Sequence, residues 1–397
     1  MSRLDELIRE LCPDGVEYIP IRNLIKQKNV CTVTPSFKVK RNDYKESGLV
    51  PIISQEQEFI SGYCEKVDKN IISRNYVCFG DHSEHIKYVN FTFVQGADGL
   101  KIMYTNEDII LARYFYHAVL AYYKRHNNYE RHFKYFCDTF IPLPPLQVQS
   151  EIVRILDNFT ELTAELTAEL TARQKQYNYY RNKLLTFNGA DIPVVQLRTV
   201  VKKSCSGSTP TKGNSDYYEN GTIPWIRTQD VRFNEITEVD SFITEKAVAE
   251  TAVKWIPENC VIVAISGATA GRCAINKIKA TTNQHCLNLE IDESKALYRY
   301  IYYCIYNKYD ELLSRKQGAR GDLNSSLVLS LEIPVPPLDV QKRLVHVLDN
   351  FDAICSDLNI GLPAEIEARQ KQYEFYRDAL LTYAATGKTI LTDRQTD

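Results

Sequence analysis

A long internal repeat constrains this chain more than any other feature. The segment IPLPPLQVQSEIVRILDNF at residues 141–159 returns as IPVPPLDVQKRLVHVLDNF at residues 333–351. A second segment, ARQKQYNYYRNKLLTF at residues 172–187, returns as ARQKQYEFYRDALLTY at residues 368–383. Self-similarity over such lengths, in the same order, indicates a duplicated structural unit. The chain is therefore made of two half-copies.

Each copy of the repeat is predicted to be a long helix. Prolines open both copies and suit an extended lead-in before a helix begins. A rod of about 40 residues, roughly 60 Å long, must bury its apolar stripe against an equally long partner, so the two copies are predicted to pack as an antiparallel coiled coil. Spacings of three and four define the stripe: Ile152, Ile155, Phe159, Leu162, Leu166 and Leu170 in the first copy, and Leu344, Val347, Phe351, Ile354 and Leu358 in the second.

The N-terminal residues complete this arrangement. RELCPDGVEYIPI at residues 9–21 echoes NKLLTFNGADIPV at residues 182–194, which ends and follows the first helix. The opening of the chain thus resembles the continuation expected after the second helix. An antiparallel return would bring the C-terminus back to the first globular region, and the interpretation is a pseudo-two-fold ring.

Two globular regions lie between the helices, and they show no visible resemblance to each other beyond their edges. Both are rich in short β-like runs broken by Gly, Asn, Asp and Pro, and both close with a tyrosine-rich helical segment. The predicted fold class is α/β, with two mixed α/β domains separated by two long helices. The predicted boundaries are residues 1–140 for the first domain with the N-terminal segment, 141–187 for the first helix, 188–332 for the second domain, and 333–397 for the second helix and tail.

The run ELTAELTAELTA at residues 161–172 predicts an adjustable spacer. Four residues are close to one helical turn, so Leu162, Leu166 and Leu170 lie on nearly the same face. Between the shared LDNF and ARQKQY motifs the first copy has 12 residues and the second has 16, a difference of one TAEL unit. The segment NIGLPAEI at residues 359–366 contains Gly and Pro, so the second helix is expected to kink or loop there.

Composition restricts the cellular environment and the binding surfaces that the chain can have. The 397 residues are 44% hydrophobic and 25% charged, without an apolar run long enough to span a membrane. The eleven cysteines are scattered and form no CxxC pair, which favours a reduced, cytoplasmic setting. The net charge is -2, so any nucleic-acid-binding surface must be local or shared with a partner.

The alternating order of repeated helices and divergent domains resembles a known family. Two helices led by PLPPL or PVPPL and ending in ARQKQY, together with GTIPWIRTQDV, SGATAGRCAI and TTNQHCLNL in the second domain, look like the specificity subunit of a Type I restriction-modification system. The resemblance covers essentially the whole chain. It implies two target recognition domains that each read one half of a split, asymmetric site on double-stranded DNA.

The resemblance also implies partners and a division of labour. The helices would dock two methyltransferase (modification) subunits, and restriction subunits, which act as an ATP-dependent translocase and nuclease, would join later. S-adenosylmethionine and ATP are then expected in those partners, with no cofactor and no catalytic residue in this chain. The residues agree, because the sequence has no Asn-Pro-Pro-aromatic or Asp-Pro-Pro-Tyr motif, no GxxxxGK[ST] loop and no nuclease-like acidic cluster.

The second domain offers four candidate DNA-binding segments. A polar run after a buried-looking strand suits base readout, because Arg fits the guanine edge and Gln the adenine edge. A flexible loop and a glycine-punctuated basic run suit phosphate contacts, and the turn in ISGATAGRCAI suits presentation of small polar groups rather than nucleotide binding. Charged turns and plain surface loops are the competing interpretations. The candidates are Arg227, Thr228, Gln229 and Asp230; Lys212 and Asn214; Ser266 and Thr269; and Arg315, Lys316 and Arg320.

The first domain offers a basic run with interleaved aromatics, YYKRHNNYERHFKYF, which suits a phosphate backbone. The competing interpretation is an amphipathic helix end with a solvated face. Two further segments, SQEQEFISGY and FGDHSEH, supply polar side chains for contacts. The candidates are Lys124, Arg125, Arg131, His132 and Lys134; Gln55 and Gln57; and His82, Ser83 and His85.

Other interpretations stay open at this point. Cys78 with His82 and His85 has metal-like spacing, but no fourth ligand is suggested, so no metal is predicted. The repeated ARQKQY admits a nucleic-acid patch, a helix core built on Tyr177 and Tyr373, or a partner interface. The competing functions are a coiled-coil scaffold without a DNA role and a self-sufficient DNA-modifying enzyme.

Overall fold

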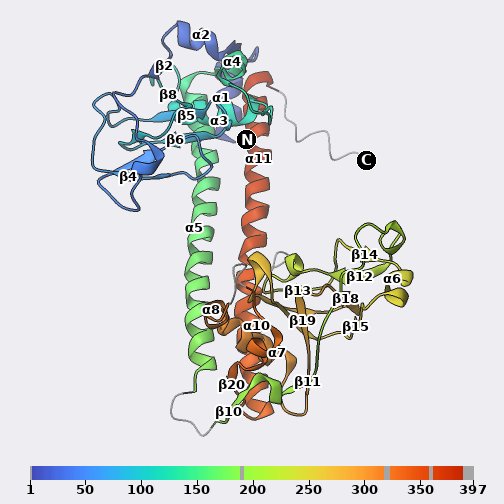
Figure 1. The fold of residues 1–397 in the computed structure, drawn as a ribbon. Coiled ribbons are helices and arrows are strands. Elements are labelled where there is room, and N and C mark those ends of the chain that lie inside the picture. Colours follow the sequence, from blue (N-terminus) through green and yellow to red (C-terminus); the bar gives the residue numbers. More distant parts are fainter. Residues whose placement is uncertain (1, 188–191, 317–321, 357–360, 388–397) are drawn as a thin grey trace. The chain divides into compact units, whose positions relative to one another are not determined.

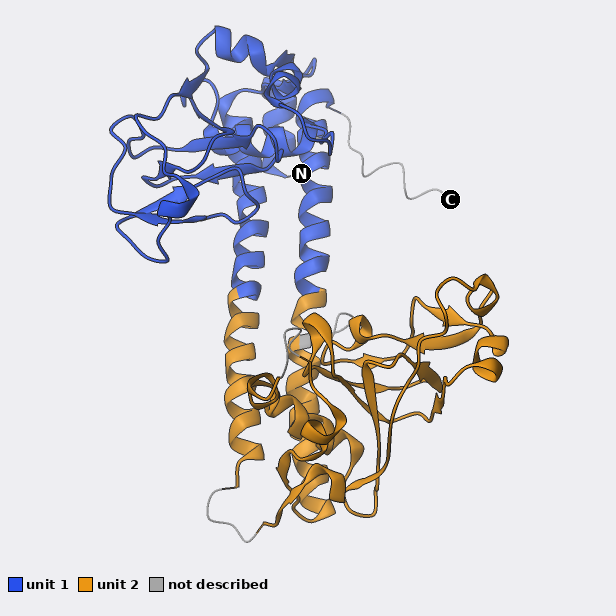
Figure 2. Cartoon of the chain, in the orientation of Figure 1, with its two compact units in different colours: residues 1–167, 365–397 blue, residues 168–364 orange. Residues whose placement is uncertain are grey.

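The structure, a computed structural model, describes residues 2–187, 192–316, 322–356 and 361–387 (Figure 1). The chain divides into two compact units, which Figure 2 shows in different colours. The unit called unit 1 comprises residues 1–167 and 365–397, and unit 2 comprises residues 168–364. Each unit therefore combines one globular region with parts of the repeated helices.

The repeated element is helical in both copies, as predicted. Helix α5 (Leu146–Leu185) is continuous over 40 residues, whereas the second copy is divided into α10 (Leu338–Ser356) and α11 (Leu362–Thr386). Helices α5 and α10 both begin directly after their proline pair. The division between α10 and α11 falls where a kink or loop was predicted, although residues 357–360 lie outside the described part of the chain. Pro363 is tolerated in the first turn of α11 because that turn has no partner for an N–H group.

Unit 1 contains a four-stranded sheet of order β2-β8-β5-β6, a three-stranded sheet of order β4-β3-β7 in which β3 and β7 are parallel, and a β1–β9 pair. Strand β5 is buried along its whole length, which is why YVCFG is almost entirely apolar. The strands are β1 (Tyr18–Pro20), β2 (Val30–Val33), β3 (Val50–Ile53), β4 (Gly62–Cys64), β5 (Tyr76–Gly80), β6 (Ile86–Val89), β7 (Val94–Gln95), β8 (Leu100–Thr105) and β9 (Phe140–Pro142). The helices besides α5 and α11 are α1 (Arg3–Leu11), α2 (Ile21–Lys26), η1 (Arg41–Asp43), α3 (Ala112–Tyr122) and α4 (Phe133–Asp138).

The N-terminal residues of unit 1 join the end of α11, as the repeat predicted. The Val16 N–H donates to the carbonyl of Ala385 (3.0 Å), and the Leu143 N–H donates to that of Glu17 (3.2 Å). The end of α11 therefore lies near the start of α5, and the two helices run antiparallel within unit 1. Gly15 has φ +83°, and a Cβ there would lie 2.8 Å from the Ala385 carbonyl oxygen, so this junction requires glycine.

Unit 2 contains a five-stranded sheet of order β11-β19-β16-β17-β13, a four-stranded sheet of order β14-β12-β18-β15 and a β10–β20 pair. The strands are β10 (Val194–Gln196), β11 (Val201–Ser206), β12 (Ile223–Ile226), β13 (Glu235–Ile236), β14 (Phe242–Ile243), β15 (Trp255–Ile256), β16 (Val261–Ala264), β17 (Cys273–Asn276), β18 (Ala280–Thr282), β19 (Cys286–Ile291) and β20 (Glu332–Pro334). The helices besides α5 and α10 are η2 (Leu197–Thr199), η3 (Ser215–Tyr217), η4 (Thr228–Asp230), α6 (Glu245–Glu250), η5 (Gly267–Thr269), α7 (Tyr298–Asn307), α8 (Tyr309–Ser314) and α9 (Ser325–Leu329).

Aromatic contacts join the repeated helices inside each unit. In unit 1, Phe159 of α5 stacks on Tyr376 of α11 with ring centroids 5.2 Å apart. In unit 2, Phe351 of α10 stacks on Tyr177 of α5 at 6.3 Å. The tyrosines of the two ARQKQY motifs, Tyr177 and Tyr373, are 4% and 6% exposed, so both are core residues.

The leucines of the TAEL run are less buried than predicted. Leu162 is 46% exposed, and Leu166 and Leu170 are half-buried. Along α5 the core of unit 1 ends at Phe159 and the core of unit 2 begins at Leu170. Leu162 and Leu166 therefore belong to neither core, and the expectation of a continuously buried stripe is wrong in this stretch. The spacer role of the run stays a prediction.

The two globular regions share a strand topology that the sequence did not reveal. Strands β2, β8, β5 and β6 of unit 1 have the same pairing as β11, β19, β16 and β17 of unit 2, and β4, β3 and β7 match β14, β12 and β18. The match includes the parallel pairs β3–β7 and β12–β18. Unit 2 adds β13 and β15 at sheet edges. The expectation that the regions resemble each other only at their edges is corrected, because loops of different length and composition conceal a common frame.

Equivalent side-chain contacts attach each globular region to its helix. Gln149 of α5 and Gln341 of α10 are fully buried. Each side-chain oxygen accepts a hydrogen bond from the N-cap residue of α3 or α7 (2.9 Å in both), and each side-chain nitrogen donates to the first carbonyl of the proline pair (2.8 Å in both). The duplication is thus preserved in individual buried hydrogen bonds.

Candidate nucleic-acid interface

Three loops of unit 1 lie together. The Gln55 side-chain oxygen accepts a hydrogen bond from the His82 N–H (3.1 Å), and the Gln55 carbonyl accepts one from the Ser83 hydroxyl. The His132 N–H donates to the carbonyl of Asp81 (2.8 Å). Residues predicted from three separate segments are therefore brought to one face. The loops are called loop A (residues 54–61), loop B (residues 81–85) and loop C (residues 123–132).

Loop C carries the basic side chains predicted to contact phosphates. Lys124, Arg125 and Arg131 are exposed. Tyr129 is 90% exposed, and its ring stacks on that of His82 in loop B with centroids 5.3 Å apart. Exposed cations beside an exposed aromatic ring suit both the phosphate backbone and the faces of bases.

Glu84 of loop B fixes the position of loop C. Its carboxylate accepts hydrogen bonds from the Tyr123 hydroxyl (2.5 Å), the His126 N–H (2.9 Å) and the Asn127 N–H (2.8 Å). Burial alone would raise the pKa of Glu84, but these hydrogen bonds outweigh it and lower the pKa to about 2. Glu84 is therefore ionised at neutral pH and holds the start of loop C against the β5–β6 hairpin.

The other predicted residues of unit 1 differ in exposure. Gln57 of loop A is exposed. Lys134 of α4 is also exposed and pairs with Glu130 (3.3 Å). His132 is fully buried, and its Nε2 lies 2.9 Å from the carbonyl oxygen of Asn128. His132 therefore supports loop C from within and does not face solvent.

Cys78, His82 and His85 do not form a metal-binding group among the described residues. Cys78 is buried in β5, and burial raises the pKa of its thiol to about 12. Burial also lowers the pKa of His85, as do the positive charges of Arg125 and Lys87. His85 is therefore neutral at physiological pH.

Four loops of unit 2 also lie together. The Ser208 N–H donates to the carbonyl of Thr282 (3.0 Å), and the Trp225 indole N–H donates to the carbonyl of Ser208 (3.2 Å). The Thr209 hydroxyl hydrogen-bonds the side chain of Gln284. Helices η4 and η5 lie against each other. The loops are called loop D (residues 227–234), loop E (residues 265–272), loop F (residues 283–285) and loop G (residues 207–222).

Loop D holds the polar run predicted for base readout. Gln229 is exposed, and Arg227, Thr228 and Asp230 are half-buried. The Asp230 carboxylate accepts a hydrogen bond from the Arg227 N–H (2.7 Å), which closes the η4 turn. The Nε of Arg227 is buried without a hydrogen-bond partner among the described residues. Loop D is thus closed by a local hydrogen bond and carries one unsatisfied donor.

Loops E and G hold four further predicted residues. Lys212 of loop G is exposed. Asn214 is half-buried and caps η3, so its side chain already has a structural role. Ser266 and Thr269 of loop E are half-buried, and the Ser266 hydroxyl donates to Asp322 (2.6 Å).

The basic segment after α8 belongs only partly to this face. The Arg315 guanidinium pairs with Glu311 of α8, so it is engaged inside unit 2. Lys316 is half-buried, and Arg320 lies outside the described residues. The Leu323 N–H donates to the first carbonyl of loop E (2.8 Å), which places the end of this segment beside that loop.

Two loops of each unit follow equivalent strands. GLVPIISQEQ at residues 48–57 runs through β3 into loop A, and GTIPWIRTQD at residues 221–230 runs through β12 into loop D. The N–H after β7 donates to the last carbonyl of β3 (2.9 Å), and the N–H after β18 donates to the last carbonyl of β12 (3.0 Å). Loops B and E are likewise the turns of the equivalent β5–β6 and β16–β17 hairpins.

Sequence reasoning missed three candidate contacts. Gln284 and His285 of loop F are exposed, and they share the face of unit 2 with the predicted residues of loops D and G. Their signal was the polar NQH directly after a β-like run. Tyr129 of loop C was also missed, although an aromatic inside a basic, Asn-containing run could have indicated it.

These features define a class of protein. It has two α/β domains in tandem that share one strand order, and the loops of the two domains carry different polar and basic side chains. Comparison with known sequences is consistent with this class. The profile of the Type I restriction modification DNA specificity domain matches residues 23–173 and again residues 190–368. The chain is 32% identical over 404 residues to the specificity subunit of the Escherichia coli Type I restriction enzyme EcoR124I/EcoR124II, covering 96% of this chain and 97% of that subunit. A putative specificity subunit of Haemophilus influenzae is 32% identical over 260 residues, covering 62% and 64%.

Solved structures agree in fold. A chain from work on complex assembly and conformational transition of the type I R-M system has a TM-score of 0.58 at 16% identity, covering 95% of this chain and 99% of that one. The Type I S subunit from M. genitalium has a TM-score of 0.52 at 13% identity, covering 94% and 97%. The chain belongs to the family of Type I restriction-modification specificity subunits, with one target recognition domain in each unit.

The competing functions find no support in these comparisons, neither the coiled-coil scaffold nor the self-sufficient DNA-modifying enzyme. Within the described part of the chain, no helix combines the length and apolar character needed to cross a membrane.

Proposed function

We propose that unit 1 and unit 2 each read one half of an asymmetric, bipartite site on double-stranded DNA, and that the chain itself catalyses no reaction. The observation that carries this proposal is that the two units share one strand order but carry different loops. Loops A and B of unit 1 and loops D and E of unit 2 follow equivalent strands but present different side chains. Different side chains at equivalent positions are what two different half-sites require.

Particular groups suit contact with DNA in each unit. In unit 1 the exposed cations of loop C suit phosphates, and Gln57 suits an adenine edge. In unit 2 the Arg227 Nε lacks a partner among the described residues, and leaving a buried donor unpaired costs about 1–3 kcal/mol. A guanine or phosphate oxygen would satisfy that donor. Gln229 and Gln284 are exposed beside it on the same face.

We also propose that the repeated helices dock two methyltransferase subunits, and that restriction subunits with ATP-dependent translocase and nuclease activity complete the assembly. The support is the similarity to the specificity subunit of a Type I restriction enzyme. S-adenosylmethionine and ATP would bind those partners, since the sequence carries neither a methyltransferase motif nor a phosphate-binding loop. All eleven cysteines are free thiols, which supports a cytoplasmic location.

The test compares the purified chain alone with the chain mixed with candidate methyltransferase subunits. Methyl transfer and DNA binding are measured on a pool of random sequences at several salt concentrations. We expect no methyl transfer by the chain alone, and sequence-specific, salt-sensitive binding once the complex assembles. Methyl transfer by the highly purified chain alone, or a complex that selects only one continuous sequence, would contradict the proposal.

A further inference from the structure

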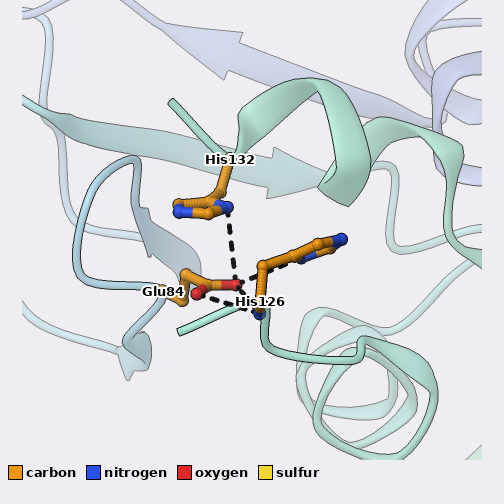
Figure 3. A group of neighbouring side chains, drawn as sticks. All are labelled: Glu84, His126 and His132. Atoms are coloured by element: carbon orange, nitrogen blue, oxygen red, sulfur yellow. Dashed lines mark hydrogen bonds and ion pairs between the residues drawn. The ribbon is translucent and has the colours of Figure 1, made fainter. Parts of the chain in front are cut away.

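Three metal-ligating side chains of unit 1 converge (Figure 3). One nitrogen from each imidazole of His126 and His132 and a carboxylate oxygen of Glu84 lie within 4.8 Å of one another. Glu84 belongs to the β5–β6 turn, His126 to the middle of loop C, and His132 to the residue before α4. The residues are far apart in sequence, so only the fold assembles them.

The distances suit a bound cation. The Glu84 Oε2 lies 3.5 Å from the Nδ1 of His126 and 3.7 Å from the Nδ1 of His132. A tetrahedral zinc ion with bonds of about 2.0–2.2 Å to nitrogen and oxygen holds its ligand atoms roughly 3.4 Å apart. The two distances from Glu84 therefore need to close by only a few tenths of an ångström, and the ligand nitrogens of the two imidazoles lie no more than 4.8 Å apart.

The hydrogen bonding of His132 points the same way. Its Nε2 lies 2.9 Å from the carbonyl oxygen of Asn128, which can only accept, so Nε2 carries a proton. The Nδ1 faces the Glu84 carboxylate and is buried without a hydrogen-bond partner among the described residues. When the ring is neutral, the Nδ1 and the carboxylate are two acceptors facing each other across a gap that a cation would fill. Donation from the second ring nitrogen to a backbone carbonyl is also how metal-binding histidines are usually oriented.

We propose that Glu84, His126 and His132 bind one divalent cation of the zinc class, which fastens loop C to the β5–β6 turn. Two imidazoles and a carboxylate are ligands that zinc accepts, and a fourth position stays open to water on the side where His126 is 37% exposed. The site differs from the sequence-based expectation of no metal, because its residues were not associated by spacing.

The cation has a defined mechanical role. Loop C carries Lys124, Arg125 and Arg131, and His126 lies between these cations in the loop. Anchoring His126 to the hairpin fixes the backbone from which the cations extend. The described residues of unit 2 contain no comparable group of histidine and acidic side chains.

The test uses the full chain after treatment with a chelator. Zn²⁺ binding is measured by calorimetry, and Co²⁺ is titrated as a spectroscopic probe. The variants are H126A and H346A, which each remove an exposed histidine, the latter from α10 outside the group. We expect one Zn²⁺ per chain for the wild type and H346A, and an affinity at least about tenfold weaker for H126A. The cobalt spectrum should lack a thiolate charge-transfer band, because no cysteine is a ligand.

A second variant locates the site. H126C replaces one ligand by another, so cobalt binding should persist and a thiolate band should appear. Circular dichroism checks that each variant is folded. No stoichiometric binding by the wild type, equal binding by H126A and H346A, or a thiolate band in the wild type would each overturn the proposal.

Discussion

Unit 1 and unit 2 share the same strand order and buried contacts, and they differ in their exposed loops. Gln149 and Gln341 make the same buried hydrogen bonds, and the two sheets of each unit follow the same strand order apart from two added edge strands. The loops differ instead: unit 1 places a basic loop with an exposed tyrosine on its face, whereas unit 2 places glutamine, arginine and histidine side chains there. Buried contacts therefore preserve the duplication, and exposed loops have been free to diverge.

One buried contact also differs between the units. In unit 1, His117 of α3 lies between the Tyr373 hydroxyl (2.8 Å from Nδ1) and Asp157 (3.4 Å from Nε2). In unit 2 the equivalent residue of α7 is Tyr303, whose hydroxyl donates to Asp349 (2.6 Å). The carboxylate is thus satisfied by a titratable base in one unit and by a hydroxyl in the other. The comparison predicts that pH affects the two units differently.

The largest expected effect follows from exchanging one globular region. Replacing residues 190–332 with the corresponding region of a relative should change one half-site completely and leave the other intact, because this region is attached to the helices through equivalent buried contacts in both units. Sequencing the sites methylated by the assembled complex measures the result. A change in both half-sites would show that the two units do not read independently.

The next effect concerns the helices. Inserting a further TAEL unit after residue 170 should lengthen α5 by about 6 Å, against about 3.4 Å per base pair of DNA. We expect both half-sites to be kept and the unread gap between them to lengthen by one or at most two base pairs. Methylation of a library with varied gaps gives the measurement, and retention of the original gap would reject the spacer role.

The equivalence of the two frames can be tested with Q149A and Q341A. Each substitution leaves one backbone N–H and two backbone carbonyls without their side-chain partner, which should cost about 2–3 kcal/mol of stability. Hydrogen exchange should show the loss in unit 1 for Q149A and in unit 2 for Q341A. The control is Q147A, at an exposed position of the same helix. If either variant increased hydrogen exchange equally in both units, the two units would not be stabilised independently.

The difference between the loops can be tested with Q57A and Q229A. Both glutamines are exposed on their loop faces. A base contact by glutamine contributes about 1–3 kcal/mol of discrimination, so each variant should relax one position of one half-site by roughly tenfold or more. Binding of the assembled complex to single-base variants of the site is the readout. If Q57A and Q229A weaken all sequences equally, these residues contact phosphates instead.

The smallest expected effect is the pH dependence of unit 1. Burial lowers the pKa of His117 below its ordinary value of 6.5, although the hydrogen bond to Asp157 opposes this. The unfolded chain therefore takes up a proton at a higher pH than the folded unit does. Unit 1 keeps this stability above about pH 6.5 and loses it as the pH falls toward the lowered pKa, by at most about 1.4 kcal/mol per pH unit.

Hydrogen exchange between about pH 7.5 and 5.5 measures this effect, after correction for the intrinsic exchange rate. Unit 1 should weaken more than unit 2, and H117Q should reduce the difference, whereas H346Q at an exposed position should leave it unchanged. An H117Q protein with the same pH dependence as the wild type would assign the effect to other groups.

The sequence by itself determined the elements that depend on local order. Proline pairs set where α5 and α10 begin, spacings of three and four made both copies helical, and Pro363 with its neighbours placed the break before α11. The echo between the N-terminal segment and the residues ending the first helix predicted that this segment continues from the second helix, where the Val16 N–H donates to the Ala385 carbonyl. These features can be predicted from the sequence because a helix and its ends are set by residues within a few positions of one another.

Only the tertiary structure decided which side chains share a face. The common strand order of the two regions, the grouping of loops A to C, and the meeting of Glu84 with His126 and His132 each join residues separated by long stretches of chain. The same holds for burial, which turned His132 inward while leaving Tyr129 exposed. Such contacts depend on how strands pair and how loops close. The spacing of residues along the sequence predicts neither.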